Sequence, residues 1–132
     1  MLRAFPSMTL QAPIPLLRIF DVALAKAFYC DWLGFKLDWE HRFSETSPHY
    51  LQVSRDAAIF HLTGHHGDCT PGSKVFIHLD DVEAYHRELA TRPNPHMNPG
   101  VETAFWNARV MEVIDPFGNR ICFNQALPEA QP

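Results

Sequence analysis

The sequence has few cysteines and no long hydrophobic run. Its three cysteines, Cys30, Cys69 and Cys122, are an odd number in 132 residues and show no CxxC spacing. This argues against a disulfide framework and is typical of a reducing cytoplasm. A membrane-spanning helix needs about 20 consecutive apolar residues, and Pro6 interrupts the only N-terminal candidate for a signal peptide. We therefore expect a cytoplasmic protein without membrane contacts.

Positive charge and nucleotide-binding motifs are also scarce. The formal net charge is −4 with neutral histidines, which argues against a nucleic-acid partner. The chain has no GxSxG, no P-loop and no Gly-rich dinucleotide fingerprint. These absences exclude the common nucleotide-binding and serine-nucleophile classes.

Apolar and aromatic residues are plentiful. Hydrophobic residues make up 46% of the chain, which includes ten Phe, three Trp and three Tyr. This is enough for the core of one domain or of two fused half-domains.

The stretch Arg109–Gln125 predicts a strand, a turn and a strand. Apolar positions at both ends flank Asp115-Pro116-Phe117-Gly118-Asn119. Proline presets its own φ, and glycine and asparagine tolerate positive φ, so this stretch is turn chemistry.

The whole chain predicts the element order β-α-β-β-β twice. The junctions Phe20-Asp21-Val22 and Asp80-Asp81-Val82 both look like a strand followed by a capped helix, 60 residues apart (81 − 21). The predicted strands are 14–20, 35–43, 49–54, 57–63, 73–79, 101–105 and the two of the closing hairpin, and the helices are 21–33 and the one that begins at 80–81. We divide the chain into a tail (1–13), a first module (14–63), a linker (64–72), a second module (73–125) and a tail (126–132).

Three short motifs occur in a fixed order along the chain. They are Ile14-Pro15-x-Leu17-x-Ile19-x-Asp21, then Ala25-x-x-Phe28-Tyr29-x-x-x-Leu33-Gly34-Phe35, and finally Asp115-Pro116-x-Gly118-Asn119-x-Ile121. Together they resemble the glyoxalase/bleomycin resistance/dioxygenase superfamily, the vicinal oxygen chelate fold, over residues 14–125. The resemblance implies an α+β fold in which two βαβββ modules form a cupped mixed sheet around a cavity. It also implies a frequent homodimer with shared cavities.

Members of this superfamily either hold a divalent metal with His and Glu ligands or, like bleomycin resistance proteins, hold none. The resemblance places the four ligand positions at Ile14, His61, Lys74 and Cys122. Ile14 cannot ligate and a charged Lys74 ligates poorly, whereas a catalytic zinc usually needs three protein ligands. We therefore expect no metal and no other cofactor.

Strand alternation predicts which side chains share the face of His61. We expect the ligand-binding residues to include Ile59 and His61 in one strand, Phe76 in the next module, and Arg120 and Cys122 in the last strand. Trp39, His41 and Trp106 are further candidates, although a core strand or a surface-packed tryptophan explains them equally well. Positions of opposite parity, such as Leu17, Phe60, Ile77 and Phe123, should lie under the helices.

The strand predicted at 35–43 alternates without interruption. Phe35, Leu37, Trp39, His41 and Phe43 would share one face, and the charged residues between them would face solvent.

The sequence thus favours a bleomycin-resistance-like binding protein, without metal, that sequesters an aromatic or drug-like molecule in a dimer-associated cavity. The alternative is a divergent lyase or dioxygenase whose metal uses His61. Cys122 could act as a nucleophile with His61 as its base, but an ordinary strand cysteine is the interpretation we favour. The roles of His65, His66 and Cys69 stay open, as does the charge of the ligand.

Overall fold

The computed structural model describes residues 5–129, so parts of both predicted tails, 1–4 and 130–132, lie outside the described residues. The elements are β1 (Leu16–Arg18), α1 (Val22–Lys26), η1 (Ala27–Trp32), β2 (Lys36–His41), β3 (Tyr50–Arg55), β4 (Ala58–Thr63), β5 (Lys74–His78), α2 (Val82–Ala90), β6 (Val101–Ala104), β7 (Ala108–Ile114) and β8 (Arg120–Ala126). The β-α-β-β-β order occurs twice, as predicted, and β8 runs one residue into the predicted C-terminal tail.

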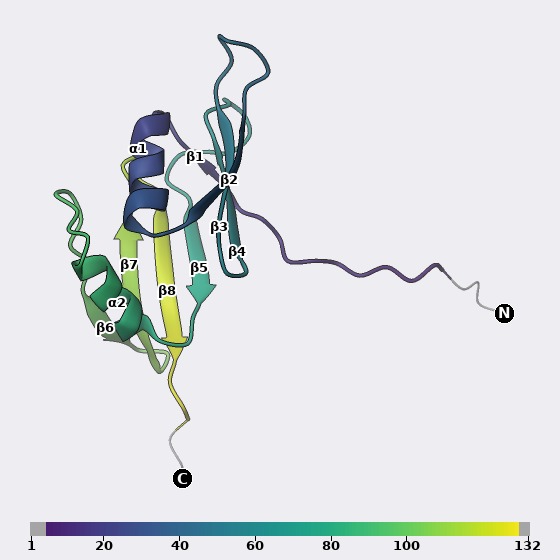
Figure 1. Ribbon diagram of the computed structural model, residues 1–132. Coiled ribbons are helices and arrows are strands. Elements are labelled where there is room, and N and C mark those ends of the chain that lie inside the picture. Colours follow the sequence, from purple (N-terminus) through teal and green to yellow (C-terminus); the bar gives the residue numbers. More distant parts are fainter. Residues whose placement is uncertain (1–4, 130–132) are drawn as a thin grey trace.

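Each module forms its own four-stranded mixed sheet, in the orders β1-β4-β3-β2 and β5-β8-β7-β6. In both, the first strand pairs in parallel with the last, and the other pairs are antiparallel. Figure 1 shows the first sheet edge-on and the strands of the second broadside, so the two sheets lie at an angle to each other. The predicted α+β fold with two βαβββ modules is confirmed.

Both predicted helix starts are capped by an aspartate. The Asp21 carboxylate accepts from the backbone N–H of Leu24 at 2.9 Å, and that of Asp81 accepts from Ala84 at 3.0 Å. These bonds satisfy N–H groups that a helix start leaves without partners.

The first helix differs from the prediction after its opening turns. From Ala27 to Trp32 it is a π-helix, and the N–H of Leu33 donates to the carbonyl of Phe28, five residues back, at 2.9 Å. The chain ends this wide turn at Gly34, whose φ of 78° suits glycine, and a Cβ there would lie 2.6 Å from Arg55 Nη1.

The predicted alternation of strand 35–43 was wrong. A register shift between Leu37 and Trp39 places Leu37 opposite Val53 but Trp39 opposite Gln52. One extra residue reverses the side to which the following side chains point. Phe35 therefore stacks on the core residue Phe60, with ring centroids 5.2 Å apart, whereas Trp39 points to the other side of the sheet.

The core lies between the helices and the inner faces of both sheets. Positions predicted to lie under the helices are buried, including Leu17, Phe60 and Phe123, each at most 2% exposed. Ile77, which was predicted to belong with them, is only half-buried.

A buried polar network joins the modules at the turn between β7 and β8. The Asp115 carboxylate accepts from the Tyr29 hydroxyl at 2.6 Å, and from the N–H groups of Phe117 and Asn119 at 2.8 Å each. The Asn119 side-chain amide donates to Asp115 and to the carbonyl of Arg18 at 2.8 Å each. Burial raises the pKa of Tyr29, and the charge of Asp115 adds to this rise. The predicted turn is thus also an inter-module joint.

A second joint links β3 to α2. Both terminal guanidinium nitrogens of Arg55 donate to Glu88, at 2.6 and 2.7 Å, and Arg92 donates to the same carboxylate at 2.6 Å. The hydrogen bonds from Arg55 lower the pKa of Glu88 to about 2, and that from Arg92 contributes.

Among the described residues, no helix is long and apolar enough to cross a membrane.

Candidate functional site

The first candidate surface is the side of the first sheet that points away from the helices. We call it the first-module face and define it by Trp39, His41, Tyr50, Gln52 and His61. Strand register places these residues together, because Trp39 lies opposite Gln52, Gln52 opposite His61, and His41 opposite Tyr50.

This face carries an aromatic platform. The rings of Trp39 and Tyr50 stack with an interplanar angle of 7° and centroids 5.9 Å apart. His61 meets both rings edge-on, at 5.3 and 5.1 Å. A shallow depression of about 480 Å³ lies beside the platform and is lined by Trp39, Tyr50, His41 and their neighbours Glu40 and Phe43. Trp39 is 42% exposed, so a flat ligand could stack there.

A chain of hydrogen bonds fixes the protonation state of His61. Gln52 donates its side-chain N–H to Asp38 at 3.1 Å, which turns its carbonyl oxygen toward His61 Nε2 at 2.9 Å. His61 therefore donates from Nε2 and accepts from the Tyr50 hydroxyl at Nδ1, over 2.7 Å. Burial lowers the pKa of His61, so the neutral imidazole is favoured.

The second candidate surface is the equivalent side of the second sheet. We call it the second-module face and define it by Phe76, Trp106, Glu112, Cys122 and Asn124. Cys122 lies opposite both Phe76 and Glu112 in the strand register. Trp106, in the turn between β6 and β7, donates its indole N–H to the Asn124 side-chain oxygen at 2.7 Å. Phe76 and Trp106 are 49% and 47% exposed, so aromatic surface is available here too.

An ion pair flanks Cys122. The Lys74 ammonium lies 3.0 Å from Glu112 Oε1, an ion pair whose geometry is not that of a hydrogen bond. Burial raises the pKa of Cys122, and Lys74 and Glu112 act on it in opposite directions. A raised pKa keeps the thiol protonated and unreactive, and no described contact joins Cys122 to His61. The structure therefore offers no support for Cys122 as a nucleophile.

Seven of the eight predicted site residues fall into two groups, and the eighth, Ile59, lines a separate groove described below. Trp39, His41 and His61 lie on the first-module face. Phe76, Trp106 and Cys122 lie on the second, with Arg120 beside them opposite Lys74. Among the described residues, no hydrogen bond, ion pair or aromatic contact links one face to the other.

Sequence reasoning missed several residues of these faces. Tyr50 and Gln52 alternate with buried Leu51 and Val53, so the parity of that strand could have revealed them. Asn124 has the same parity in β8 as Cys122, so alternation could have revealed it, but its bond to Trp106 has no signal in the sequence.

The residues present do not fit the metal site of the metal-binding relatives. Of the four positions, Ile14 has no donor atom, and the Lys74 ammonium is paired with Glu112. Both ring nitrogens of His61 are engaged, by Tyr50 and Gln52. In residues 5–129, no three His, Cys, Asp or Glu side chains cluster as metal ligands would.

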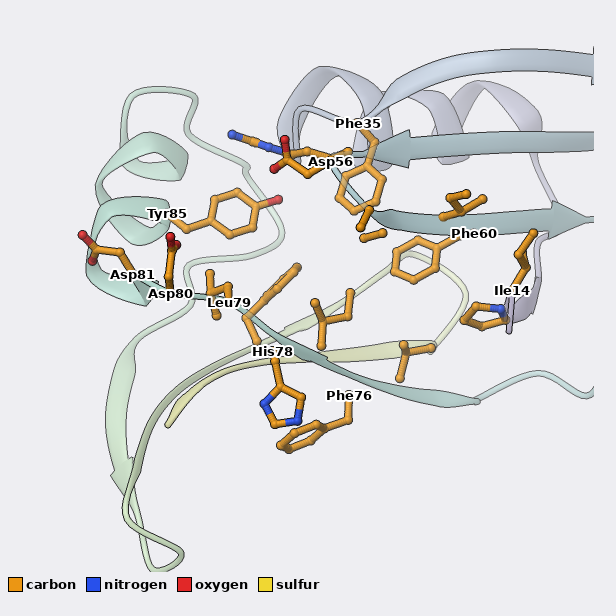
Figure 2. A pocket seen from close by; sticks show the side chains of 18 of the residues that line it. Ile14, Phe35, Asp56, Phe60, Phe76, His78, Leu79, Asp80, Asp81 and Tyr85 are labelled. Carbon is orange, nitrogen blue, oxygen red and sulfur yellow. The ribbon is translucent and has the colours of Figure 1, made fainter. Parts of the chain in front are cut away.

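A separate groove of about 900 Å³ lies between the modules, and we call it the inter-module groove. It is lined by Pro13–Pro15, Phe35, Arg55–Phe60, Val75–Asp81, Ala84, Tyr85, Glu88 and Phe123. Figure 2 shows Phe60, Phe35 and Tyr85 along its aromatic interior, Asp80 and Asp81 at one end, and Asp56 apart from them, beside Phe35. Two predicted site residues from different modules, Ile59 and Phe76, both line it, although the Phe76 ring projects to the other side of β5.

Comparisons with known proteins agree with this architecture. A family model described as "Glyoxalase superfamily protein" matches residues 2–129. The chain belongs to the glyoxalase superfamily. Among curated relatives of this glyoxalase-superfamily chain, a bleomycin resistance protein of Geobacillus stearothermophilus is 23% identical over 128 residues, covering 86% of this chain and 96% of the relative.

Solved structures give the same fold. A bleomycin-binding protein in complex with bleomycin superimposes with a TM-score of 0.67 at 21% identity, and covers 90% of this chain and 100% of that one. The bleomycin-binding protein of Streptomyces verticillus, in complex with copper(II)-bleomycin, gives a TM-score of 0.65 at 25% identity, and covers 92% and 100%. The predicted superfamily and its bleomycin-resistance-like fold are confirmed.

Proposed function

We propose that this chain binds and sequesters a flat aromatic, drug-like small molecule, and that it does so without a metal. The observation that carries the proposal is the stacked Trp39–Tyr50 platform, which is open to solvent and held by His61. Aromatic walls with a few fixed polar groups are typical of small-molecule sites. The bleomycin-binding relatives support a ligand of the bleomycin type.

We also propose that the ligand site forms between two copies in a homodimer. Each chain presents two faces with half-exposed aromatic residues that do not contact each other. The outer strands β1 and β5 each have one neighbour in their sheets, so each leaves an edge open. A dimer that places the first-module face of one copy against the second-module face of the other would cover both.

The charges favour a neutral or cationic ligand over an anionic one. Of the three cations near the faces, Lys74 is paired with Glu112, and the Arg18 guanidinium lies over the Phe20 ring at 4.8 Å. In residues 5–129, neither Arg18 nor Arg120 forms an ion pair, so these two guanidinium groups are the ones near the faces that an anion could contact. The net charge of −4 favours cations at long range.

The proposed absence of a metal rests on the donor set. His61 would have to give up one of its two hydrogen bonds to ligate, and its lone pair at Nδ1 is taken by the Tyr50 hydroxyl. Elemental mass spectrometry of untagged protein, purified without chelators, tests this directly. We expect negligible Mn, Fe, Ni or Zn; close to one equivalent per chain would favour the metalloenzyme alternative instead.

Isothermal titration calorimetry with metal-free bleomycin tests the binding proposal. We expect saturable binding with a Kd in the micromolar range or tighter, about −8 kcal/mol or better. Leu24→Ala is the control, because Leu24 is 51% exposed on α1 and lies on the helix side of the first sheet, away from the platform. No heat and no competition by a panel of aromatic glycopeptide drugs would overturn the proposal.

We propose a cytoplasmic location as well. The three cysteines are free thiols in the structure, which supports a reducing compartment. Cell fractionation with an antibody against the chain would test it, and recovery outside the cytoplasmic fraction would contradict it.

A further inference from the structure

A further hollow lies on the helix side of the molecule. It has a volume of about 930 Å³ and lies between η1, the loop after α2 and the turn between β7 and β8, and we call it the helix-side groove. Its lining includes Phe28, Trp32, Met97 and Ile114, together with prolines of the loop and the turn. It shares no lining residue with the two open faces or with the inter-module groove. Its size and its mainly apolar wall are typical of a small-molecule site.

A buried hydrogen-bond donor without an acceptor forms part of this wall. Trp32 is only 5% exposed, and its indole N–H reaches no acceptor among the described residues. The indole N–H of Trp106, by contrast, donates to Asn124. A buried indole usually has a partner, because an unmade hydrogen bond leaves the cost of removing the group from water uncompensated. The wall therefore lacks one acceptor, which the carbonyl oxygen of a bound molecule would supply.

The charges of the helix-side groove disfavour an anion. Two carboxylates, those of Asp31 and Asp115, line it. The guanidinium that lines it belongs to Arg92, which donates to Glu88 at 2.6 Å and to the backbone carbonyl of Trp32 at 2.8 and 3.0 Å. Because this cation is already engaged and the carboxylates repel negative charge, a neutral molecule suits the groove better than a carboxylate or a phosphate.

The loop 93–99 covers the buried tryptophan and leaves room to move. The carbonyl of Pro99 accepts from His86 at 3.0 Å, which fixes the far end of the loop to α2. In its middle, the described hydrogen bonds join Asn94 only to the N–H groups of His96 and Met97, within the loop itself. Loop residues and the same tryptophan also line a second pocket of about 380 Å³. The middle of the loop can therefore shift without breaking a described hydrogen bond to the rest of the chain, and this movement gives access to the indole.

We propose that the helix-side groove is a second binding site, for a neutral and mainly apolar small molecule whose carbonyl oxygen accepts from the Trp32 indole. The rings of Phe28 and Trp32, with centroids 5.2 Å apart and planes at 50°, form its apolar floor. Met97 and the loop prolines cover the bound molecule. The site is separate from the Trp39–Tyr50 platform, so it adds a second ligand class to the proposed function and does not depend on it.

NMR with two shape-matched probes tests the proposal. Camphor is a compact ketone without an aromatic ring to stack on Trp39, and 2-methylenebornane carries a CH₂ group in place of its carbonyl oxygen. The indole ¹H–¹⁵N signal of Trp32, assigned by its loss in Trp32→Phe, reports on the hydrogen bond. We expect camphor to move this proton downfield and to bind at least about tenfold tighter than 2-methylenebornane. A signal that stays in place, or that moves equally with both probes, would overturn the proposal.

A variant that fills the helix-side groove gives a second test and leaves the core intact. Ala27 lines the groove with an exposed side chain, so Ala27→Phe should occupy part of it and weaken camphor binding by about tenfold or more. Ala23→Phe is the matched control, because it adds the same ring at an exposed position of α1 outside the groove lining, and we expect a change below about twofold. Equal effects of the two substitutions would overturn the proposal.

Bleomycin calorimetry on the same variants keeps the two proposals apart. Ala27→Phe should leave bleomycin binding unchanged, because Ala27 belongs to neither open face. Bleomycin binding without camphor binding would overturn only the second site, and camphor binding without bleomycin binding would overturn only the proposed function.

Discussion

The two modules repeat one architecture but present different chemistry on their open faces. On the first-module face, hydrogen bonds run from Tyr50 through the neutral His61 and Gln52 to the Asp38 carboxylate, beneath a stacked Trp39. On the second-module face, an ion pair flanks a buried cysteine, and the exposed aromatic residues come from an edge strand and a turn.

The features that the two modules share are those that determine the fold. Both helices start at an aspartate cap, and both sheets have the same strand order. The faces are free to differ because core packing does not constrain side chains that point away from the helices. A ligand held between such faces would stack on one side and meet an ion pair on the other.

The turns between the last two strands of each module should differ most in how much they contribute to the free energy of unfolding. Asp115→Ala removes four hydrogen bonds in a buried network, and we expect the free energy of unfolding to fall by about 3 kcal/mol or more. Asp56→Ala, in the exposed turn of the first module, should cost under about 1 kcal/mol. Urea denaturation measures both. Similar losses would show that the two turns are energetically alike.

Removing one tryptophan from each face probes whether both faces hold the ligand. We expect Trp39→Ala and Trp106→Ala each to weaken bleomycin binding by about 30-fold, or about 2 kcal/mol, because the ligand would lose an aromatic ring on which it stacks. Leu24→Ala, on α1, should leave the affinity unchanged. Calorimetry decides, and a loss confined to one variant would assign the site to one face.

Lowering the pH should reduce both the stability of the first-module face and its affinity for the ligand, because His61 becomes protonated. Its pKa is lowered by burial in the folded chain, so the neutral imidazole contributes stability that is fully present above its ordinary pKa of about 6.5. That contribution is lost as the pH falls through the lowered folded pKa, because an imidazolium cannot accept from Tyr50. An NMR titration of His61, alongside bleomycin affinity against pH, measures this. His61→Gln should flatten the corresponding part of the profile, and an unchanged profile would contradict the role of His61.

The ion pair of the second-module face should contribute least. The side chains of Lys74 and Glu112 are 58% and 36% exposed, so water screens their attraction. In a double-mutant cycle with Lys74→Met and Glu112→Gln, we expect a coupling of about 1 kcal/mol or less in stability. A coupling well above this value would mean that the second-module face is as tightly organised as the first.

Sequence patterns predicted the order of elements and most of the core. Turn residues, helix caps and alternation are local signals, and Asp21, Asp81 and Asp115 all act where those signals placed them. The π-helical turn at Ala27–Trp32 and the bulge after Leu37 were not predictable, because each is imposed by packing against the rest of the chain.

The candidate site was predictable only in part. Alternation placed His61, Phe76 and Cys122 on open faces, but it could not show that the two faces are apart within one chain. The bond between Trp106 and Asn124 joins residues 18 positions apart and depends on how the turn folds back over the sheet. Contacts of this kind follow from tertiary structure, not from sequence pattern.

The central claim is that one ligand site combines the first-module face of one copy with the second-module face of the other. The most direct measurement is bleomycin calorimetry on an equilibrated mixture of Trp39→Ala and Trp106→Ala chains. Each mixed dimer should regain one tight site, since one of its two cavities then holds both tryptophans. A mixture that binds no better than the average of the two separate variants would contradict the claim.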